Sequence, residues 1–139
     1  MTNAGSETDD PGIRADARLW RRIHPSWFVP VANTSERQVS SQAFQNGRKP
    51  DGKPADHMSV TLADHPQAPT SPTEAVAGKY SGYGLVEFSA GLARSLNQGV
   101  RHTPTAEEPA HASVTGAKTR TVIAGFKAGS RLLKEPTVE

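Results

Sequence analysis

The stretch PAHASVTGAKTRTVIAGFKAGSRLLK, which runs from Pro109 to Lys134, decides the fold class because it joins a strand pattern to a helix pattern. Its first part, AHASV, is typical of a strand, and Gly116 separates this part from the second. The second part predicts a helix from about Lys118 to Lys134. A strand and a helix in one short stretch indicate a domain that contains both kinds of element.

Other segments predict the same mixture of strands and helices. MSVTL, from Met58 to Leu62, alternates apolar and polar residues as a half-buried strand does. A further strand is predicted up to about His24, and another over Leu85 to Phe88 leads into a helix over Ala90 to Leu96. We therefore expect an α+β fold with a small mixed or antiparallel sheet and two or three helices.

A short helix is predicted near the middle of the chain by its start signals. Ser71 can cap the helix, Pro72 suits its first position, and Glu74 follows the cap by three residues. Gly78 then ends it after about two turns.

The C-terminal helix is predicted to be amphipathic and basic. Its apolar stripe on a helical wheel contains Val122, Phe126, Gly129 and Leu133. The nearly opposite face carries a row of four cations, Arg120, Lys127, Arg131 and Lys134. The stripe is expected to pack on the domain, where Gly129 permits close approach to a strand.

This basic row has two interpretations. Lysine and arginine side chains at intervals of one turn can follow the phosphates of a nucleic acid or bind an acidic partner. The same row also suits a solvated face with cations near a helix C-terminus. Lys118 and the backbone amides that follow Gly116 extend the first interpretation to an anion site, although the spacing does not match a phosphate-binding loop.

The composition limits the size of the ordered part. Hydrophobic residues make up 35% of the 139 residues, and the acidic segment 1–16 holds one large aliphatic residue, so we expect a disordered tail there. A single globular domain is expected over 17–135, with a C-terminal tail over 136–139. No segment has the apolar run of a signal peptide or a membrane span, so we expect a cytoplasmic protein without a membrane partner.

Several kinds of chemistry are excluded or disfavoured. The chain has no cysteine, which excludes disulfides, a thiolate nucleophile and cysteine-based metal sites. The five histidines form no metal-binding spacing, and no G-x-S-x-G motif surrounds a serine. We expect no metal and no cofactor, and we expect a binding or accessory protein rather than an enzyme.

One enzymatic alternative remains open. The order of an arginine on the first strand, a serine pair and a later glutamate resembles that of arginine-serine-glutamate ADP-ribosyltransferases, which consume NAD. The resemblance implies Arg22, Ser40 or Ser41, and Glu87 as the catalytic residues. Two departures are that the aromatic residue follows the serines here and that Glu87 lies near the middle of the chain.

A second resemblance covers more of the chain. The string LWRRIHP, VSSQAF, MSVTLAD, AGLARSLNQGV and PAHASVTGAKT, spanning Leu19 to about Thr119, is similar to a group of small bacterial hypothetical proteins. It implies a bacterial, single-domain protein and carries no functional residues. A structural, oligomer-forming protein is a third alternative, with Trp20, Trp27 and Phe28 at its interface.

Overall fold

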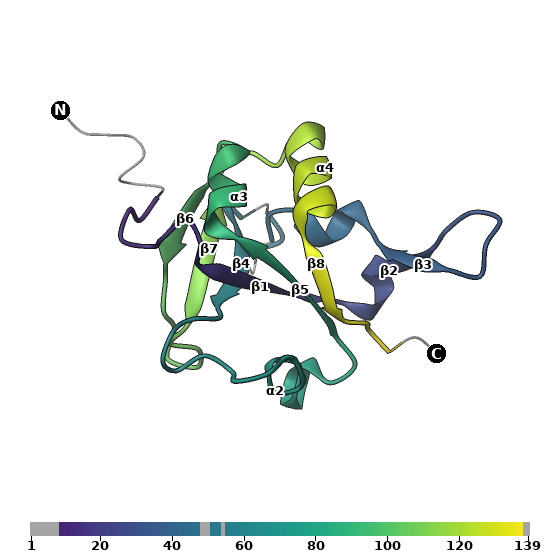
Figure 1. Cartoon of the computed structure of the whole chain (residues 1–139), viewed down its shortest axis with the longest axis horizontal. Coiled ribbons are helices and arrows are strands. Elements are labelled where there is room, and N and C mark those ends of the chain that lie inside the picture. The colour runs from purple at the N-terminus through teal and green to yellow at the C-terminus, as the bar shows by residue number, and fades with distance from the viewer. Residues whose placement is uncertain (1–8, 48–50, 54, 138–139) are drawn as a thin grey trace.

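An antiparallel sheet of six strands forms the centre of the molecule, in the order β6-β7-β4-β1-β5-β8 (Figure 1). The computed structural model describes residues 9–47, 51–53 and 55–137. The six strands are β1 (Arg18–Ile23), β4 (His57–Leu62), β5 (Gly84–Ser89), β6 (Gly99–His102), β7 (His111–Thr115) and β8 (Arg131–Lys134). A separate hairpin pairs β2 (Phe28–Pro30) with β3 (Arg37–Val39). With its helices, this sheet confirms the predicted α+β class.

One side of the sheet, which we call the helix face, is apolar. Its side chains come from alternate positions of the central strands and are almost wholly buried: Leu19, Ile23, Met58, Val60, Val86, Phe88 and Val114. Three short elements cover them, namely η2 (Ser41–Phe44), α3 (Ala90–Ser95) and α4 (Arg120–Gly129). Burial of this apolar surface is the main contribution to the stability of the fold.

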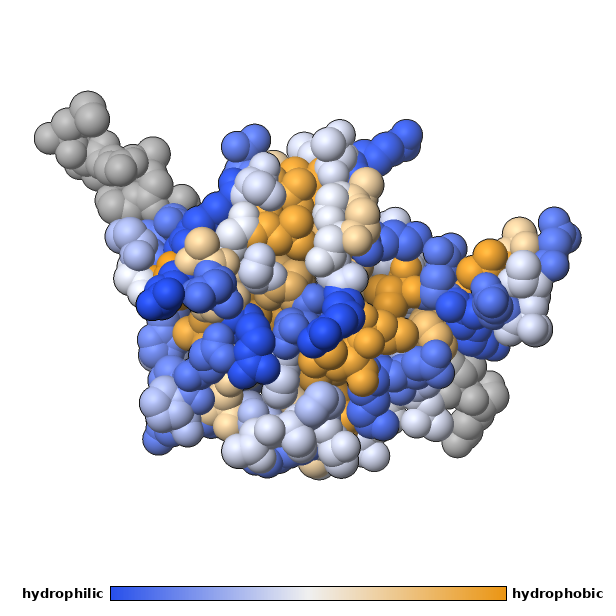
Figure 2. All heavy atoms as spheres, viewed as in Figure 1, coloured by the Kyte–Doolittle hydropathy of each residue, from blue (hydrophilic) through white to orange (hydrophobic). Residues whose placement is uncertain are grey.

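The two covering helices begin at capping hydroxyl groups and pack closely against each other. Ser89 Oγ accepts a hydrogen bond from the Leu92 amide, and Thr119 Oγ1 accepts one from the Val122 amide. A Cβ atom on Gly129 would lie 2.7 Å from Leu92 Cδ2, so Gly129 permits the approach of helix α3. The expected approach to a strand is therefore wrong. Figure 2 shows the hydrophobic seam between α3 and α4.

The opposite side of the sheet, which we call the cleft face, is mostly polar. Its residues include Trp20, Arg22, Thr61, Leu85, Glu87, His111 and Ser113. A small apolar cluster of Trp20, Leu85, Ala75 and Val76 anchors α2 (Pro72–Ala75) and the following η3 (Gly78–Tyr80) on part of this face. The rest of the cleft face is not covered by a helix of the described chain (Figure 1).

The start of α2 matches its predicted signals, although the helix is shorter than expected. Ser71 Oγ accepts a hydrogen bond from the Glu74 amide at 3.2 Å, and Pro72 is the first helical residue. Glu74 bonds to the hydroxyl group and the amide of Thr70. The helix ends after one turn, and Gly78, at φ 64°, begins η3.

The C-terminal helix predicted from about Lys118 to Lys134 is confirmed, but its predicted C-terminal end is wrong. Helix α4 begins at Arg120 and ends at Gly129, and Ser130 has an extended backbone with φ −89° and ψ 156°. Residues 131–134 then form β8 and pair with β5, for example through Val86 and Leu132. The gain of backbone hydrogen bonds along the sheet edge outweighs the helical pattern of this segment.

Both predicted tails are partly ordered where they meet the domain. Asp9 Oδ1 accepts hydrogen bonds from Arg94 Nε at 3.0 Å and from the Val100 amide at 2.9 Å. The Asp10 amide donates to the Val100 carbonyl at 2.7 Å, so this segment lies along β6. At the other end Pro136 is buried. Residues 1–8 and 138–139 lie outside the described residues.

Candidate functional site

A cleft opens on the cleft face where β1 and β4 diverge. The two strands pair only at Leu19 with Leu62 and at Trp20 with Thr61, whereas β1 pairs with β5 along its whole length. Beyond Trp20, the Ser59 carbonyl accepts its hydrogen bond from the Arg21 side chain instead of from the β1 backbone. The resulting cleft has a volume of about 330 Å³. Its lining includes Arg21, Arg22, Trp27, Tyr80, Glu108 and His111.

Arg22 is held in the cleft by contacts on several sides. Its Nε donates to the Ala75 carbonyl at 2.7 Å, and its Nη1 lies 3.2 Å from Glu108 Oε1 and 3.4 Å from Thr61 Oγ1. The guanidinium carbon lies 4.1 Å from the centroid of the Tyr80 ring. Nη2 donates no hydrogen bond to the described residues. The guanidinium therefore has a fixed position and a donor left for a ligand.

Arg21 lies beside the gap between the strands, on the helix-face side of β1. Its Nε donates to the Ala43 carbonyl at 2.9 Å and its Nη1 to the Ser59 carbonyl at 2.8 Å. Its guanidinium carbon lies 5.4 Å from the centroid of the Trp27 ring. Burial lowers the pKa of Arg21 to about 10, so it remains protonated at neutral pH. Arg21 pairs with no carboxylate of the described chain, so an anion would relieve the cost of holding its charge away from water.

Glu108 reaches the cleft from the loop before β7. Its Oε1 accepts hydrogen bonds from Arg22 Nη1 and from Thr61 Oγ1, the second at 2.5 Å. The backbone amide of Glu108 donates to Thr105 Oγ1, which fixes the loop. The cleft lining thus contains the paired side chains of Arg22 and Glu108, and the nearby charge of Arg21 makes this region positive overall.

His111 lies where the cleft meets a second hollow. Its ring lines the cleft and also a neighbouring hollow of about 350 Å³ above β6 and β7. Its Nδ1 lies 2.8 Å from the Thr103 carbonyl, which can only accept, so Nδ1 carries the proton. In the neutral ring, Nε2 is then an acceptor that makes no hydrogen bond within the described chain.

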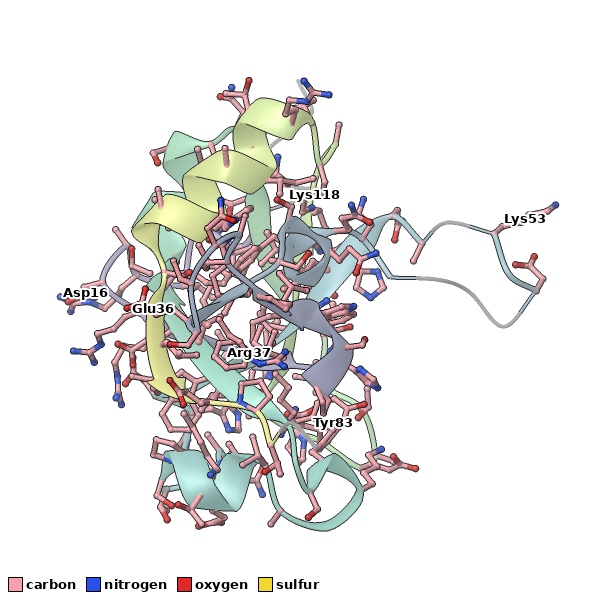
Figure 3. All side chains as sticks on the ribbon, turned by 90° about the vertical axis from the view of Figure 1, so that its right-hand side faces the viewer. Asp16, Glu36, Arg37, Lys53, Tyr83 and Lys118 are labelled. Atoms are coloured by element: carbon pink, nitrogen blue, oxygen red, sulfur yellow. The ribbon has the colours of Figure 1, made fainter. Side chains whose placement is uncertain are left out.

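The five residues predicted to bind anions lie on two elements and on the segment before them. Arg120 and Lys127 lie on α4, whereas Arg131 and Lys134 lie on β8. Arg131 pairs with Glu87 Oε2 at 3.1 Å. Lys118, labelled in Figure 3, donates to Asn46 Oδ1 and to the carbonyls of Val114 and Gly116.

Burial, and secondly the charge of Arg21, lowers the pKa of Lys118 to about 8. Its ammonium group is therefore engaged inside the chain. A single helical row of cations does not exist, because the helix ends before Arg131.

The four residues of the ADP-ribosyltransferase alternative also lie apart. Arg22 lines the cleft, but Glu87 lies in a separate hollow, where it accepts from Trp20 Nε1 and pairs with Arg18 and Arg131. Ser40 caps η2 through the Gln42 amide, and Ser41 is exposed on the same element. The carboxylate that faces Arg22 is Glu108.

The aromatic residues predicted for an oligomer interface are mostly inside the chain. Trp20 and Phe28 are buried, at 5% and 7% exposure, and only Trp27 is half-exposed. Trp20 packs against α2, so these side chains complete the domain instead of forming an outer surface.

The sequence did not indicate Tyr80, Glu108 or His111 as site residues. They come from η3, the loop before β7 and the start of β7, and only long-range packing brings them to Arg22. The one local signal was the density of polar residues in RHTPTAEEPAH. The paired motifs Asp56-His57 and Asp64-His65 lie at opposite ends of β4, as expected. Within the described ranges, no group of three histidine or acidic side chains could hold a metal ion.

Comparison with models of protein families, with curated proteins and with solved structures finds no match for this chain. The resemblances seen in the sequence therefore stay predictions, and the candidate function depends on the geometry of the cleft. None of the described helices is long and apolar enough to cross a bilayer.

Proposed function

We propose that this protein binds a nucleotide, or a nucleotide unit of a single-stranded nucleic acid, in the cleft between β1 and β4. One observation carries the proposal: the Arg22 guanidinium group, which has an unused donor, and several aromatic rings line the same cleft. A nucleotide combines an anion with an aromatic ring, so it matches both kinds of group.

The phosphate would bind at Arg22. This side chain shares Glu108 with Thr61. Its Nη2 makes no hydrogen bond to the described residues. Charge-assisted hydrogen bonds from guanidinium to phosphate are among the stronger polar contacts in proteins.

The base would stack on the aromatic part of the wall. Tyr80 and Tyr83 pack edge to face, with their ring centroids 5.3 Å apart, and His24 packs on Tyr83 at 5.2 Å. Figure 3 shows Tyr83 away from α4, toward the end of the molecule where α2 lies. These contacts hold the rings in place before a ligand arrives, which reduces the entropy lost on binding.

The size of the cleft agrees with a ligand of this kind. Its volume of about 330 Å³ lies at the lower end of the range for small-molecule sites. A further hollow of about 560 Å³, distinct from the one above β6 and β7, adjoins the cleft at Arg22, Tyr80, Glu108 and His111. It would give room for a sugar or a further phosphate.

A titration with AMP, monitored by tryptophan fluorescence, tests the proposal because Trp20 and Trp27 both line the cleft. Loss of the charge-assisted contact in Arg22→Gln should weaken AMP binding by about tenfold or more. Adenosine and inorganic phosphate should each bind less well than AMP. Arg120→Gln is the matched control, since Arg120 is an exposed arginine on α4. Equal binding by both variants would contradict the proposal.

The alternative predicted from the sequence, a nucleic-acid surface on the C-terminal cations, is tested by comparing variants in the same way. Binding of a labelled single-stranded oligonucleotide is compared for Arg22→Gln and for a variant with Arg120, Lys127 and Lys134 changed to Gln. The proposal expects the larger loss in Arg22→Gln. A larger loss in the triple variant would move the binding surface to α4 and β8.

A further inference from the structure

Two histidines face each other across β4 and β7 on the cleft face. The ring centroids of His57 and His111 lie 6.4 Å apart, and the rings are almost perpendicular at 87°. Both side chains line the hollow of about 350 Å³ beside the cleft. Two imidazoles at this separation can both reach one ligand group placed between them.

In each of the two imidazoles, Nδ1 makes a hydrogen bond within the chain. His57 Nδ1 lies 3.0 Å from Asp56 Oδ1, and His111 Nδ1 lies 2.8 Å from the Thr103 carbonyl. Both partners accept hydrogen bonds, so each Nδ1 carries a proton and each ring has a fixed orientation. Neither Nε2 makes a hydrogen bond to a described residue, so both are available to exchange a proton with a ligand.

The hollow also offers a site for an anion between the histidines and β6. Arg101 on β6 is exposed and forms no ion pair in the described part of the chain. Thr103 Oγ1 and Ser113 Oγ bond to each other at 2.7 Å in the same wall. Arg101 can compensate the charge of a phosphate group held there.

The hydroxyl groups of this wall are poorly placed to act as nucleophiles. Thr103 Oγ1 lies 3.0 Å from His111 Nδ1, the nitrogen that already carries a proton, so His111 cannot remove a proton from it through this contact. This contact therefore does not activate Thr103, whereas a substrate can bring a nucleophile of its own. In RNA, the 2′-hydroxyl group stands next to the phosphodiester and is such a nucleophile.

We infer that His57 and His111 form an acid–base pair that cleaves single-stranded RNA. One of the two imidazoles is neutral, and its Nε2 takes the proton of the 2′-hydroxyl group as the 2′-oxygen forms a bond to phosphorus. The other imidazole is protonated. As the bond from phosphorus to the 5′-oxygen breaks, this second imidazole gives its Nε2 proton to that oxygen. The products are a 2′,3′-cyclic phosphate and a 5′-hydroxyl end, and no other reactant is consumed.

The inference rests on the proposed function in one respect: the base next to the cleaved bond would occupy the cleft. His111 lines both spaces, so a base against Tyr80 and a phosphate beside His111 belong to one continuous groove. Arg22 and Glu108 face His111 from the cleft side, and Asp56 and Arg101 lie on the other side.

The test uses the full chain and a labelled DNA oligonucleotide that contains one ribonucleotide. We expect cleavage only after the ribonucleotide, in the presence of EDTA, with a 2′,3′-cyclic phosphate on the product. His57→Gln and His111→Gln should each slow the cleavage by at least about 100-fold. His65→Gln is the control and should cleave at the wild-type rate, since His65 lies outside this hollow.

Two readouts separate this inference from the proposed function. Binding of the all-DNA oligonucleotide, measured by fluorescence anisotropy, reports the cleft alone, and thermal unfolding confirms that each variant is folded. Binding without cleavage would overturn the inference and leave the proposed function standing. Cleavage unchanged in both histidine variants would also overturn it. Cleavage that depends on both histidines but not on Arg22 would support the inference and contradict the nucleotide cleft.

Discussion

The helix face and the cleft face are made from alternate residues of the same strands, yet they differ in composition and in cover. The helix face is apolar and lies under α3, α4 and η2, with Leu19, Ile23 and Met58 fully buried. The cleft face carries arginine, histidine, glutamate and hydroxyl groups, and α2 covers only part of it. The difference indicates that stability resides mainly on one face, which leaves the other free to hold polar groups for a ligand.

The largest expected effect is at the centre of the helix face. Phe126 is fully buried and packs against Phe88 and Phe44, with ring centroids 4.9 and 6.1 Å away. Phe126→Ala should lower the free energy of unfolding by about 3–5 kcal/mol, measured by urea denaturation. A loss below about 1 kcal/mol would contradict the view that this face dominates stability.

A smaller effect is expected where β5 meets the C-terminal segment. A Cβ atom on Gly84 would lie 2.7 Å from the Lys134 carbonyl oxygen and 2.5 Å from Pro136 Cδ. Gly84→Ala should therefore displace β8 and reduce the free energy of unfolding by about 1–3 kcal/mol. Gly47→Ala is the control, because its Cβ would meet no atom within 4 Å. Equal stability of the two variants would show that β8 is not held against Gly84.

The cleft face should respond in the opposite way, with a small change in stability and a clear change in binding. Tyr80 is half-buried and stacks on the Arg22 guanidinium. Tyr80→Leu should change the free energy of unfolding by about 1 kcal/mol or less and weaken AMP binding by about 1–3 kcal/mol. Denaturation and fluorescence titration of the same sample check both. A large loss of stability with unchanged binding would remove the distinction between the faces.

The last effect concerns the pH dependence of stability that Lys118 produces. Burial lowers its pKa in the folded chain to about 8, whereas an unfolded lysine titrates near 10.5. Between these values the unfolded chain binds more protons, so the free energy of unfolding should rise with pH relative to that of Lys118→Gln. Below pH 8 the difference between the two proteins should be constant. Denaturation at a series of pH values from 7 to 10 measures this difference in the free energy of unfolding. A difference that falls as the pH rises would contradict the prediction.

The sequence predicted those elements whose signals are local. MSVTL lies within β4, Leu85–Phe88 lies within β5, and the predicted Ser71 cap begins α2. β8 was not predicted because Leu133 continues the helical stripe of α4, and pairing with β5 is a long-range contact. The short β6 and the hairpin of β2 and β3 had too few residues for a pattern.

The site was less predictable than the fold. Arg22 was named from the sequence, but for an arrangement with Glu87 and the serines that does not occur. The cleft exists because β1 and β4 separate after Trp20, and no sequence pattern marks the loss of strand pairing. Lys118 looked like an exposed anion ligand, and its burial depends on Asn46, more than 70 residues away.

The segment before β1 has a consequence for how this chain meets copies of itself. Asp9 and Asp10 occupy both the amide and the carbonyl of Val100, on the outermost strand at that side of the sheet. Unsatisfied groups on a sheet edge are a template for adding a strand from another molecule. A version shortened past Asp10 to remove an acidic tail would uncover that template, and concentrated samples of it would stack edge to edge.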